Sequence, residues 1–327
     1  MKTLVIIPHF NKLILLKECL YHLEQQNYNN FDILIVDNGS TDGSSEYIYN
    51  LSKDSKYKHI LLDENMGFAY AVNRGIEYSI KYKYDYSILL NNDAYVDTNF
   101  VKNLTYSIFN RNNVFAVSSL MINYHNKDIV DSFGDGYSIL GWSMQGHVGE
   151  DVESLNSKEA CFSACAGAAI YSNDVFKEIG LFDENFFAYL EDVDISYRAK
   201  LHGYKIYACK DAFCYHLGSA TSGTKYNEFK VRISARNNIY LIYKNMPTIQ
   251  IAINIIPIAL GTIVKQIFFI NKGFGLDYFF GIFDAFKNIK HIERVDFNKV
   301  SPFRLFSIET ELVVNLFKYI KNFLIRH

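Results

Sequence analysis

Apolar and polar positions alternate in a regular order along roughly the first ninety residues of the chain. Four short apolar runs, each typical of a buried strand, end in polar turns, and amphipathic stretches typical of helices lie between them. The predicted strands are residues 3–7, 32–37, 59–63 and 86–90, and helices are predicted through residues 13–26 and 67–82, among others. Strands that alternate with helices of this length predict a parallel sheet with right-handed crossovers.

Polar residues lie at or just after the ends of these predicted strands. They are His9, Asp37, Asn38, Asn65 and Asp93. In sheets of this type, ligands bind at the carboxyl ends of the strands. The sequence therefore predicts a binding site along that edge of the sheet.

The pattern changes in the middle of the chain, at roughly residues 114–216. Short strands, glycine turns and a strand of small residues, CAGAAIYS, favour a mixed sheet over a wholly parallel one. A helix is predicted from Tyr226 to Tyr243. We therefore expect residues 1–245 to form one α/β domain, with a mixed, mainly parallel sheet flanked by helices.

Residues 246–327 form a predicted appendage of amphipathic helices. Residues 245–264 carry no charge and are long enough to span a bilayer. However, polar or small residues recur there at helical spacing and form one stripe, made of Gln250, Asn254, Gly261 and Lys265. A second helix, at residues 276–290, carries a row of Phe and Leu side chains opposite Asp277, Asp284 and Lys287, and a third stripe runs from Leu305 to Leu324.

Charge separates this appendage from the rest of the chain. From Thr248 onward ten Lys and Arg stand against six Asp and Glu, a net charge of +4, whereas the whole chain has a formal net charge of −2. Basic amphipathic helices fit a protein that lies on an anionic membrane surface better than one that crosses it, with Lys265 and Lys287 among the residues facing the headgroups. The alternative is a helical unit that packs against the core or against a second subunit in a homodimer.

Composition narrows the class of protein. The 327 residues are 49% hydrophobic and 21% charged, as in a globular chain, and the small net charge argues against nucleic-acid binding. Five cysteines, an odd number, suit a reduced cytoplasmic protein, and the N-terminal apolar run is too short for a signal peptide. Cys161 and Cys165 lie in an apolar stretch and are predicted to be core residues rather than zinc ligands.

Several nucleotide-binding and hydrolase motifs do not occur in the sequence. The first strand is followed by IIPHFNK and not by the G-x-G-x-x-G fingerprint of dinucleotide binders. Neither the P-loop pattern G-x-x-x-x-G-K-[ST] nor the G-x-S-x-G nucleophile elbow is found.

Six motifs follow in a fixed order instead. They are IIPHFN, VDNGSTDGS, ENMGFAYAVNRGI, LLNNDAYV, FAYLEDVDISYR and CYHLGSATSG. Together they resemble the inverting family-2 glycosyltransferases with the GT-A fold, and more narrowly the rhamnosyltransferase-like branch that builds bacterial surface polysaccharides. The resemblance covers about residues 3–245.

This resemblance implies a set of nucleotide-binding residues, which are Pro8, Asp37, Asn38, Asn65, Gly67 and Asn92. Asp37 would accept the N3–H of uracil or thymine, although Asp-Asn-Gly-Ser is also good chemistry for a turn. Gly67 would let the backbone approach the ribose or the phosphates. Many relatives have an arginine where this chain has Val72, so Arg74 is either a phosphate contact or part of a solvated helix face.

The resemblance also implies a metal site. Asn91-Asn92-Asp93 matches a reduced form of the family's D-x-D motif, and His216 would be the second protein ligand. One carboxylate, one imidazole, two diphosphate oxygens and water would complete an octahedron around Mg²⁺ or Mn²⁺. Taken without the family pattern, a lone histidine is more often structural.

The catalytic candidate lies in LEDVDISYR. Asp192 matches the family's general base, which removes the proton from the acceptor hydroxyl. Glu191 would orient the acceptor or simply favour the start of a helix, and Asp194 is spaced to pair with Arg198 on that helix. The loop from Gly134 to Gly149, with Trp142, is predicted to shape the acceptor side.

The sequence thus predicts a metal-dependent inverting glycosyltransferase that is cytoplasmic and peripheral at the inner face of the cell membrane. It would move a sugar, L-rhamnose by resemblance, from a dTDP- or UDP-sugar to a polyprenyl-linked saccharide or polysaccharide. One alternative is a non-catalytic nucleotide-sugar-binding scaffold. The other is a sugar-1-phosphate nucleotidyltransferase, which would need a glycine- and arginine-rich loop after the first strand that the sequence lacks.

Overall fold

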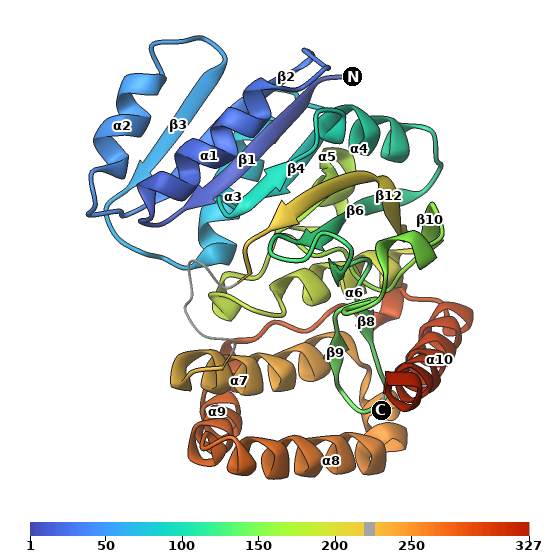
Figure 1. Cartoon of the computed structure of the whole chain (residues 1–327). Helices are drawn as coiled ribbons and strands as arrows, with labels where there is room; N and C mark the ends of the chain where they lie inside the picture. The colour runs from blue at the N-terminus through green and yellow to red at the C-terminus, as the bar shows by residue number, and fades with distance from the viewer. Residues whose placement is uncertain (219–225, 327) are drawn as a thin grey trace.

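The computed structural model describes residues 1–218 and 226–326, so that the end of the CYHLGSATSG motif lies outside the described residues. One large mixed sheet, shown in Figure 1, organises the N-terminal two-thirds of the chain. Its strand order is β10-β12-β6-β11-β4-β1-β2-β3, with β5 paired to β12 and β7 paired to β6. The strands are β1 (Thr3–His9), β2 (Phe31–Asn38), β3 (Tyr57–Leu62), β4 (Tyr86–Leu90), β5 (Ala94–Val96), β6 (Val114–Asn123), β7 (Val130–Ser132), β10 (Lys158–Ala160), β11 (Ala168–Ser172) and β12 (Lys205–His216).

The four strands predicted from the N-terminal pattern are present and parallel. β1 pairs with β2 and β4, and β2 pairs with β3, all in parallel register. The helices that follow them are α1 (Leu13–Glu24), α2 (Ser44–Leu51), α3 (Phe68–Lys81) and α4 (Phe100–Phe109). Apolar side chains fill both faces of the sheet, which explains why these strands read as continuous apolar runs.

The middle of the chain makes the sheet mixed, as the sequence predicts. β11 lies antiparallel between β4 and β6, and β12 returns parallel to β6. A separate hairpin of β8 (Gly136–Tyr137) and β9 (Ser143–Met144) lies in the loop that contains Trp142. The helices of this part are α5 (Asn173–Ile179) and α6 (Glu191–His202), and α7 (Glu228–Asn245) follows β12.

The predicted C-terminal helices are α8 (Thr248–Asn271), α9 (Gly275–Asn288) and α10 (Pro302–Arg326). Figure 1 shows them at the end of the molecule opposite β1–β3. They share one hydrophobic core with the rest of the chain: Tyr197 of α6 and Tyr240 of α7 belong to the same cluster as Ile258, Ala285 and Leu312. The predicted boundary near residue 245 therefore falls at a turn between helices and not between separate cores.

The polar stripe of α8 faces the protein. Gln250 and Asn254 are 6% and 1% exposed, and their amides donate to Glu309 of α10 over 2.6 and 3.0 Å. Lys265 is half-buried, with its ammonium 5.8 Å from the centre of the Trp142 ring. Burial lowers the pKa of Lys265 to about 8. The expectation that Lys265 faces lipid headgroups is therefore corrected, because the stripe to which it belongs is turned inward.

The apolar side of the same helices faces outward. Ile253, Ile256, Phe283, Phe286 and Phe303 are between 58% and 82% exposed. By length and composition α8 is the one helix in the described part of the chain that could cross a membrane. Of its most apolar 18-residue stretch, 17% is buried within the protein. Soluble proteins rarely expose so continuous an apolar surface without a partner for it.

Candidate active site

Asp93 and His216, far apart in the sequence, meet at the edge of the sheet. Strand β4 ends at Leu90, the chain turns through Asn91–Asp93, and β5 then pairs antiparallel with the end of β12, with Ala94 opposite His216. This register brings His216 Nε2 to 3.5 Å from Asp93 Oδ1. The predicted pair is therefore assembled by one short strand pairing.

Asp131 completes this group and was not foreseen from the sequence. It lies in β7, and its Oδ2 is 2.7 Å from His216 Nδ1. Burial would lower the pKa of His216, but the hydrogen bond to Asp131 and the charges of Asp93 and Asp131 outweigh burial and raise it to about 9. An Asp131 that accepts the Nδ1 hydrogen directs the other ring nitrogen, Nε2, toward Asp93.

The residues present fit a divalent cation. Asp93 is only 4% exposed, and within the described residues its Oδ1 accepts no hydrogen bond. A buried carboxylate oxygen without a donor is costly unless a cation satisfies it. A cation on Asp93 Oδ1 and His216 Nε2 would replace the proton that otherwise keeps His216 charged. Carboxylate and imidazole ligands suit Mn²⁺, and a carboxylate with phosphate oxygens suits Mg²⁺.

Asn92 and His9 are locked together beside this pair. Asn92 donates through Nδ2 to His9 Nδ1 over 2.8 Å, so that His9 Nε2 carries the hydrogen donated to Ser44 Oγ, also over 2.8 Å. Ser44 in turn donates to Asp42 over 2.5 Å. Burial lowers the pKa of His9 more than Asp37 and Asp42 raise it, which keeps the ring neutral. This chain ties the ends of β1 and β4 to the start of α2.

Asp37 is fully buried at the end of β2. Its Oδ1 accepts the hydroxyl of Ser40 and, over 3.3 Å, the Ser40 amide, while its Oδ2 accepts the hydroxyl of Ser45. The turn role that the sequence offered for Asp37 is thus present. Pro8, one residue before the end of β1, pairs in register with Val36 and is half-buried near the same edge.

Asn38, Asn65 and Gly67 form a rigid support between β2 and α3. Asn38 donates to Asn65 Oδ1 over 3.0 Å and to the Gly67 carbonyl over 3.1 Å, and Asn65 accepts the Gly67 amide over 3.0 Å. Gly67 has a φ of 90°, and a Cβ there would lie 2.6 Å from the ring of Phe187. The segment predicted to contact the nucleotide is therefore held without any ligand.

Arg74 lies on a helix face rather than free at the strand ends. Its guanidinium pairs with Glu77 and Glu184, at 2.9 Å each, and its side chain is 30% exposed. These pairs favour the solvated-face interpretation of Arg74 over a phosphate contact.

Asp192, at the start of α6, and the Asn91–Asp93 turn flank the same two residues, Ala166 and Gly167. The Ala166 amide donates to Asp192 Oδ2 over 3.4 Å, and the Gly167 carbonyl accepts the Asn91 amide over 2.8 Å. The Asp192 side chain is half-buried, and burial raises its pKa against the opposing effect of backbone amides. To act as a general base, Asp192 has to be ionised when the acceptor hydroxyl attacks.

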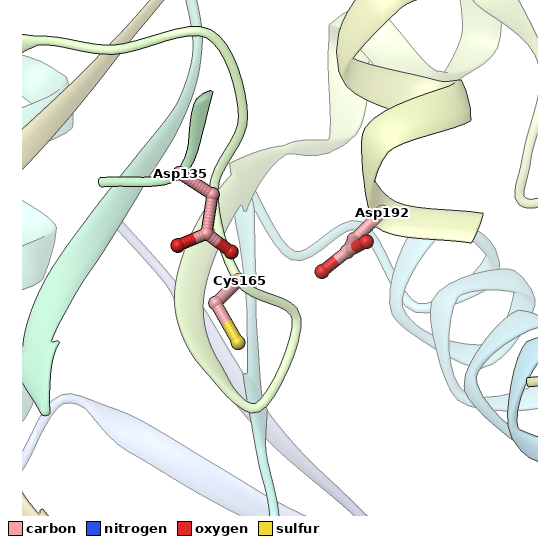
Figure 2. A group of neighbouring side chains, drawn as sticks. All are labelled: Asp135, Cys165 and Asp192. Carbon is pink, nitrogen blue, oxygen red and sulfur yellow. The ribbon is translucent and has the colours of Figure 1, made fainter. Parts of the chain in front are cut away.

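Asp135 and Cys165 lie beside Asp192 and form a second unforeseen group. One ligand-type atom from each residue lies within 4.8 Å of the others, and Figure 2 shows the two carboxylates approaching each other from different segments. Burial and then the charge of Asp192 raise the pKa of Asp135 to about 7, while Ser132 and the Gly146 amide donate to its Oδ1. At neutral pH a part of Asp135 is therefore protonated, which limits repulsion with Asp192.

Glu191 and Asp194 have different surroundings on the same helix. Glu191 is 6% exposed, and burial followed by the charge of Asp192 raises its pKa well above the usual range. Asp194 accepts Arg198 Nε over 3.0 Å, as predicted, and Lys244 Nζ over 3.2 Å. Burial alone would raise the pKa of Asp194, but these two cations lower it.

Trp142 joins its loop to the C-terminal helices. Its indole Nε1 donates to the Gly261 carbonyl of α8 over 3.1 Å, and its ring stands edge-on to Tyr319 of α10, with the ring centres 5.8 Å apart. These contacts give Trp142 a packing function, and an acceptor-side function remains a prediction.

The sequence profile of Glycosyl transferase family 2 matches residues 4–180, more than half of the chain. The chain belongs to glycosyl transferase family 2. This membership agrees with the order of strand-end motifs and with the inverting mechanism that the sequence predicts.

Individual relatives are distant. Glycosyltransferase GlyG of Streptococcus pneumoniae is 30% identical over 128 residues, covering 39% of this chain and 40% of the relative. The poly-beta-1,6-N-acetyl-D-glucosamine synthase of Staphylococcus epidermidis is 23% identical over 242 residues, covering 74% of this chain and 56% of the relative. The chain thus spans about half the length of the curated relatives it matches.

A solved structure shows the same fold. The mannosyltransferase PcManGT from Pyrobaculum calidifontis, in complex with GDP-Man and Mn²⁺, superposes with a TM-score of 0.56 at 13% identity, over 88% of this chain and 75% of that one. The predicted GT-A-type architecture, a mainly parallel sheet flanked by helices with C-terminal helices appended, is confirmed.

Proposed function

We propose that this family-2 protein is a metal-dependent, inverting glycosyltransferase that transfers a sugar from a dTDP- or UDP-sugar to a saccharide acceptor. The observation that carries the proposal is the meeting of Asp93 and His216, with Asp192 anchored on the other side of the Ala166–Gly167 segment. This arrangement supplies a cation site for a diphosphate and a separate carboxylate base, which are the two groups that a single displacement requires.

The reaction would proceed in one step. The acceptor hydroxyl attacks the anomeric carbon, the new glycosidic bond forms on one face, and the bond to the diphosphate oxygen breaks on the other. Asp192 takes the hydroxyl proton, and the nucleoside diphosphate leaves with the bonding electrons. A Mg²⁺ or Mn²⁺ ion on Asp93 and His216 would offset the negative charge of the departing diphosphate.

The donor nucleotide would lie along the ends of β1, β2 and β4. The support formed by Asn38, Asn65 and Gly67 is already rigid, which favours binding because little order has to be gained. Asp37 would receive the base N3–H, with Pro8 and Asn92 beside the nucleotide. L-rhamnose is the sugar that the resemblance favours.

The acceptor would be a polysaccharide or a polyprenyl-linked saccharide. A polysaccharide acceptor is in keeping with the relative named poly-beta-1,6-N-acetyl-D-glucosamine synthase. Glu191, next to the base, and the loop that holds Trp142 would border the acceptor.

The outer face of α8, α9 and α10 would hold the enzyme on the inner, anionic surface of the cell membrane. Exposed Ile and Phe side chains would enter the interface while the polar stripe stays bonded to the protein. In this arrangement α8 lies in the plane of the membrane, because Glu309 and Trp142 hold its polar side against the rest of the protein. The rival occupant of this face is a second copy of the chain.

The experiment that tests the activity uses a panel of UDP- and dTDP-sugars with Mn²⁺. Donor binding should raise the melting temperature by mass action, and EDTA should abolish the shift. With the selected donor, release of the nucleoside diphosphate should require an acceptor, and the product should have the inverted anomeric configuration. Binding without any turnover across acceptors would support the scaffold alternative instead.

A further inference from the structure

The segment that leads into Asp192 has an unusual backbone. Phe187, Tyr189 and Leu190 have φ values of 62°, 69° and 68°, which residues with a side chain rarely adopt. Three such residues within four positions persist only where surrounding contacts impose the conformation. Leu190 caps α6, because its carbonyl accepts the Asp194 amide over 2.9 Å. The backbone of this segment therefore fixes where α6 begins, at Glu191, and with it the position of Asp192 in the first turn.

Two neighbouring side chains of α7 hold this segment. Arg236 Nη2 donates to the carbonyls of Asn185 and Phe186 over 3.1 Å each, and Asn237 makes the bonds nearest to Asp192. Asn237 is fully buried, and its Nδ2 donates to the carbonyls of Phe186, Ala188 and Tyr189 at 2.8, 2.8 and 2.7 Å. Two amide hydrogens thus serve three carbonyls, so at least one hydrogen is shared. Asn237 Oδ1 accepts Arg236 Nε over 3.0 Å, which fixes the orientation of the amide.

The donor side of the site does not depend on Asn237 in the same way. Phe187 contacts this side, since its carbonyl accepts the Ala69 amide over 3.1 Å next to Gly67. However, Gly67 is also held through both its amide and its carbonyl by Asn65 and Asn38. Loss of Asn237 would leave those bonds in place, and the Phe186 carbonyl would keep Arg236 as a donor, but the carbonyls of Ala188 and Tyr189 would lose theirs.

The geometry points to Asn237 as a positioning residue that sets the orientation of Asp192 toward the acceptor hydroxyl. This inference rests on the proposed transferase activity. It predicts that Asn237 affects the chemical step more than it affects binding of the nucleotide. Only a side chain with two donors at this position satisfies the neighbouring carbonyls, and an isosteric carboxylate would repel them.

The adjacent residue supplies a matched control. Asn238 is also buried on α7, but its Oδ1 accepts the Tyr137 hydroxyl over 3.3 Å. An aspartate at 238 can still accept that bond, so Asn238→Asp introduces the same charge and nearly the same shape without touching the segment before Asp192. Asn237→Ala serves as a second variant that removes the amide without adding charge.

The experiment measures kcat and KM for release of UDP or dTDP from the donor that the wild-type protein turns over, and calorimetric binding of UDP and dTDP with Mn²⁺. For Asn237→Asp and Asn237→Ala we expect kcat to fall on the order of 100-fold. Nucleotide binding should be unchanged, and Asn238→Asp should retain the wild-type kcat.

A double variant separates positioning from mere stability. If Asn237 acts through Asp192, Asn237→Ala should cost nothing further in an Asp192→Asn background. The inference is overturned if kcat of both Asn237 variants equals that of Asn238→Asp, if nucleotide binding and kcat fall together, or if the double variant is additive. An Asp192→Asn variant with full activity would instead overturn the proposed mechanism.

Discussion

The two ends of this molecule distribute polarity in opposite ways. At the carboxyl edge of the sheet, apolar strands are buried and their polar ends, such as Asp93 and His216, converge. In the C-terminal helices the polar residues, such as Asn254, are buried against Glu309, and Ile253 and Phe283 face outward.

The difference indicates which kind of surroundings each end is built to meet. A polar edge with an unsatisfied carboxylate oxygen suits a charged, water-soluble ligand together with its cation. An outward apolar face suits a lipid interface or a second apolar surface. An enzyme that joins a soluble nucleotide-sugar to a lipid-linked saccharide would need both.

The largest effect, a loss of turnover, is expected from a change to Asp192, the proposed general base. Asp192→Asn keeps the shape of the side chain but cannot take a proton, so turnover should fall on the order of 10²–10⁴-fold while donor binding persists. Initial-rate measurements with parallel calorimetry would test this, with the exposed Asp211→Asn as control. If Asp192→Asn retained the turnover of the wild type, Asp192 would not be the general base.

At the other end, the exposed aromatic residues should govern membrane attachment. Phe279 and Phe283 are 55% and 58% exposed on one face of α9. The double change to Asp should weaken binding to liposomes with anionic lipid by on the order of 100-fold. The reason is that each substitution removes a phenyl ring that would be buried in the lipid interface.

A matched control lies on the catalytic part. Tyr21 and Tyr49 are 57% and 59% exposed there, so the double change to Asp at these positions should leave flotation with liposomes intact. If both double variants float alike, the outer face of the helices does not contact lipid. If the Phe279 and Phe283 double variant instead changes its oligomeric state, the outer face of the helices contacts a second copy of the chain.

The inverted stripe can be tested with two neighbouring residues of α8. Asn254→Leu removes one of the donors to Glu309 in a partly buried contact, and should reduce the free energy of unfolding by about 1–3 kcal/mol. Ile253→Asn alters a side chain that is 68% exposed and should change it by less than about 0.5 kcal/mol. Urea unfolding of the two variants measures this difference. An equal loss of unfolding free energy in both would mean that α8 does not turn Asn254 toward the protein and Ile253 away from it.

The smallest effect concerns the loop that joins the two ends. His147 contacts Glu159 and Glu150 at 2.7 Å each, and the bond to Glu159 outweighs burial, so that the pKa of His147 rises to about 9. The pKa of His147 in the folded protein thus lies above its ordinary value of 6.5. The two pairs therefore stabilise the fold fully below about pH 6.5, and this stabilisation is lost as the pH rises through about 9.

The corresponding variant is His147→Gln. The free energy of unfolding of this variant should be lower than that of the wild type by on the order of 1 kcal/mol at pH 6, since solvent partly screens the pairs. At pH 10 the two proteins should be equally stable. Melting temperatures across that range would check the sign. A difference that grows toward alkaline pH would contradict the assignment of the charge.

The N-terminal strands, the helices between them and the strand-end residues followed from the sequence, because apolar runs, the helical period and turn residues mark them. The order of the strands in the sheet was not predicted. Neither was the pairing of β5 with β12, because a three-residue strand such as Ala94–Val96 carries no periodic signal. The meeting of Asp93 with His216 could therefore be expected only from the family pattern.

Other features had no signal in a single sequence. Asp131 lies in the three-residue strand β7 and Asp135 in the segment rich in Gly and Ser that follows it, and neither carries a period that indicates which side chains turn toward His216 or Asp192. The stripe on α8 was visible, but a helical wheel does not say which side contacts the protein. For that reason Lys265 was assigned to lipid and is found against Trp142.

The most direct test of the central claim is the anomalous diffraction of Mn²⁺ in crystals grown with Mn²⁺ and UDP or dTDP. The account predicts a single strong peak in bonding contact with Asp93 Oδ1, His216 Nε2 and diphosphate oxygens. A peak among Asp135, Cys165 and Asp192 instead, or nucleotide bound with no peak beside Asp93, would contradict it.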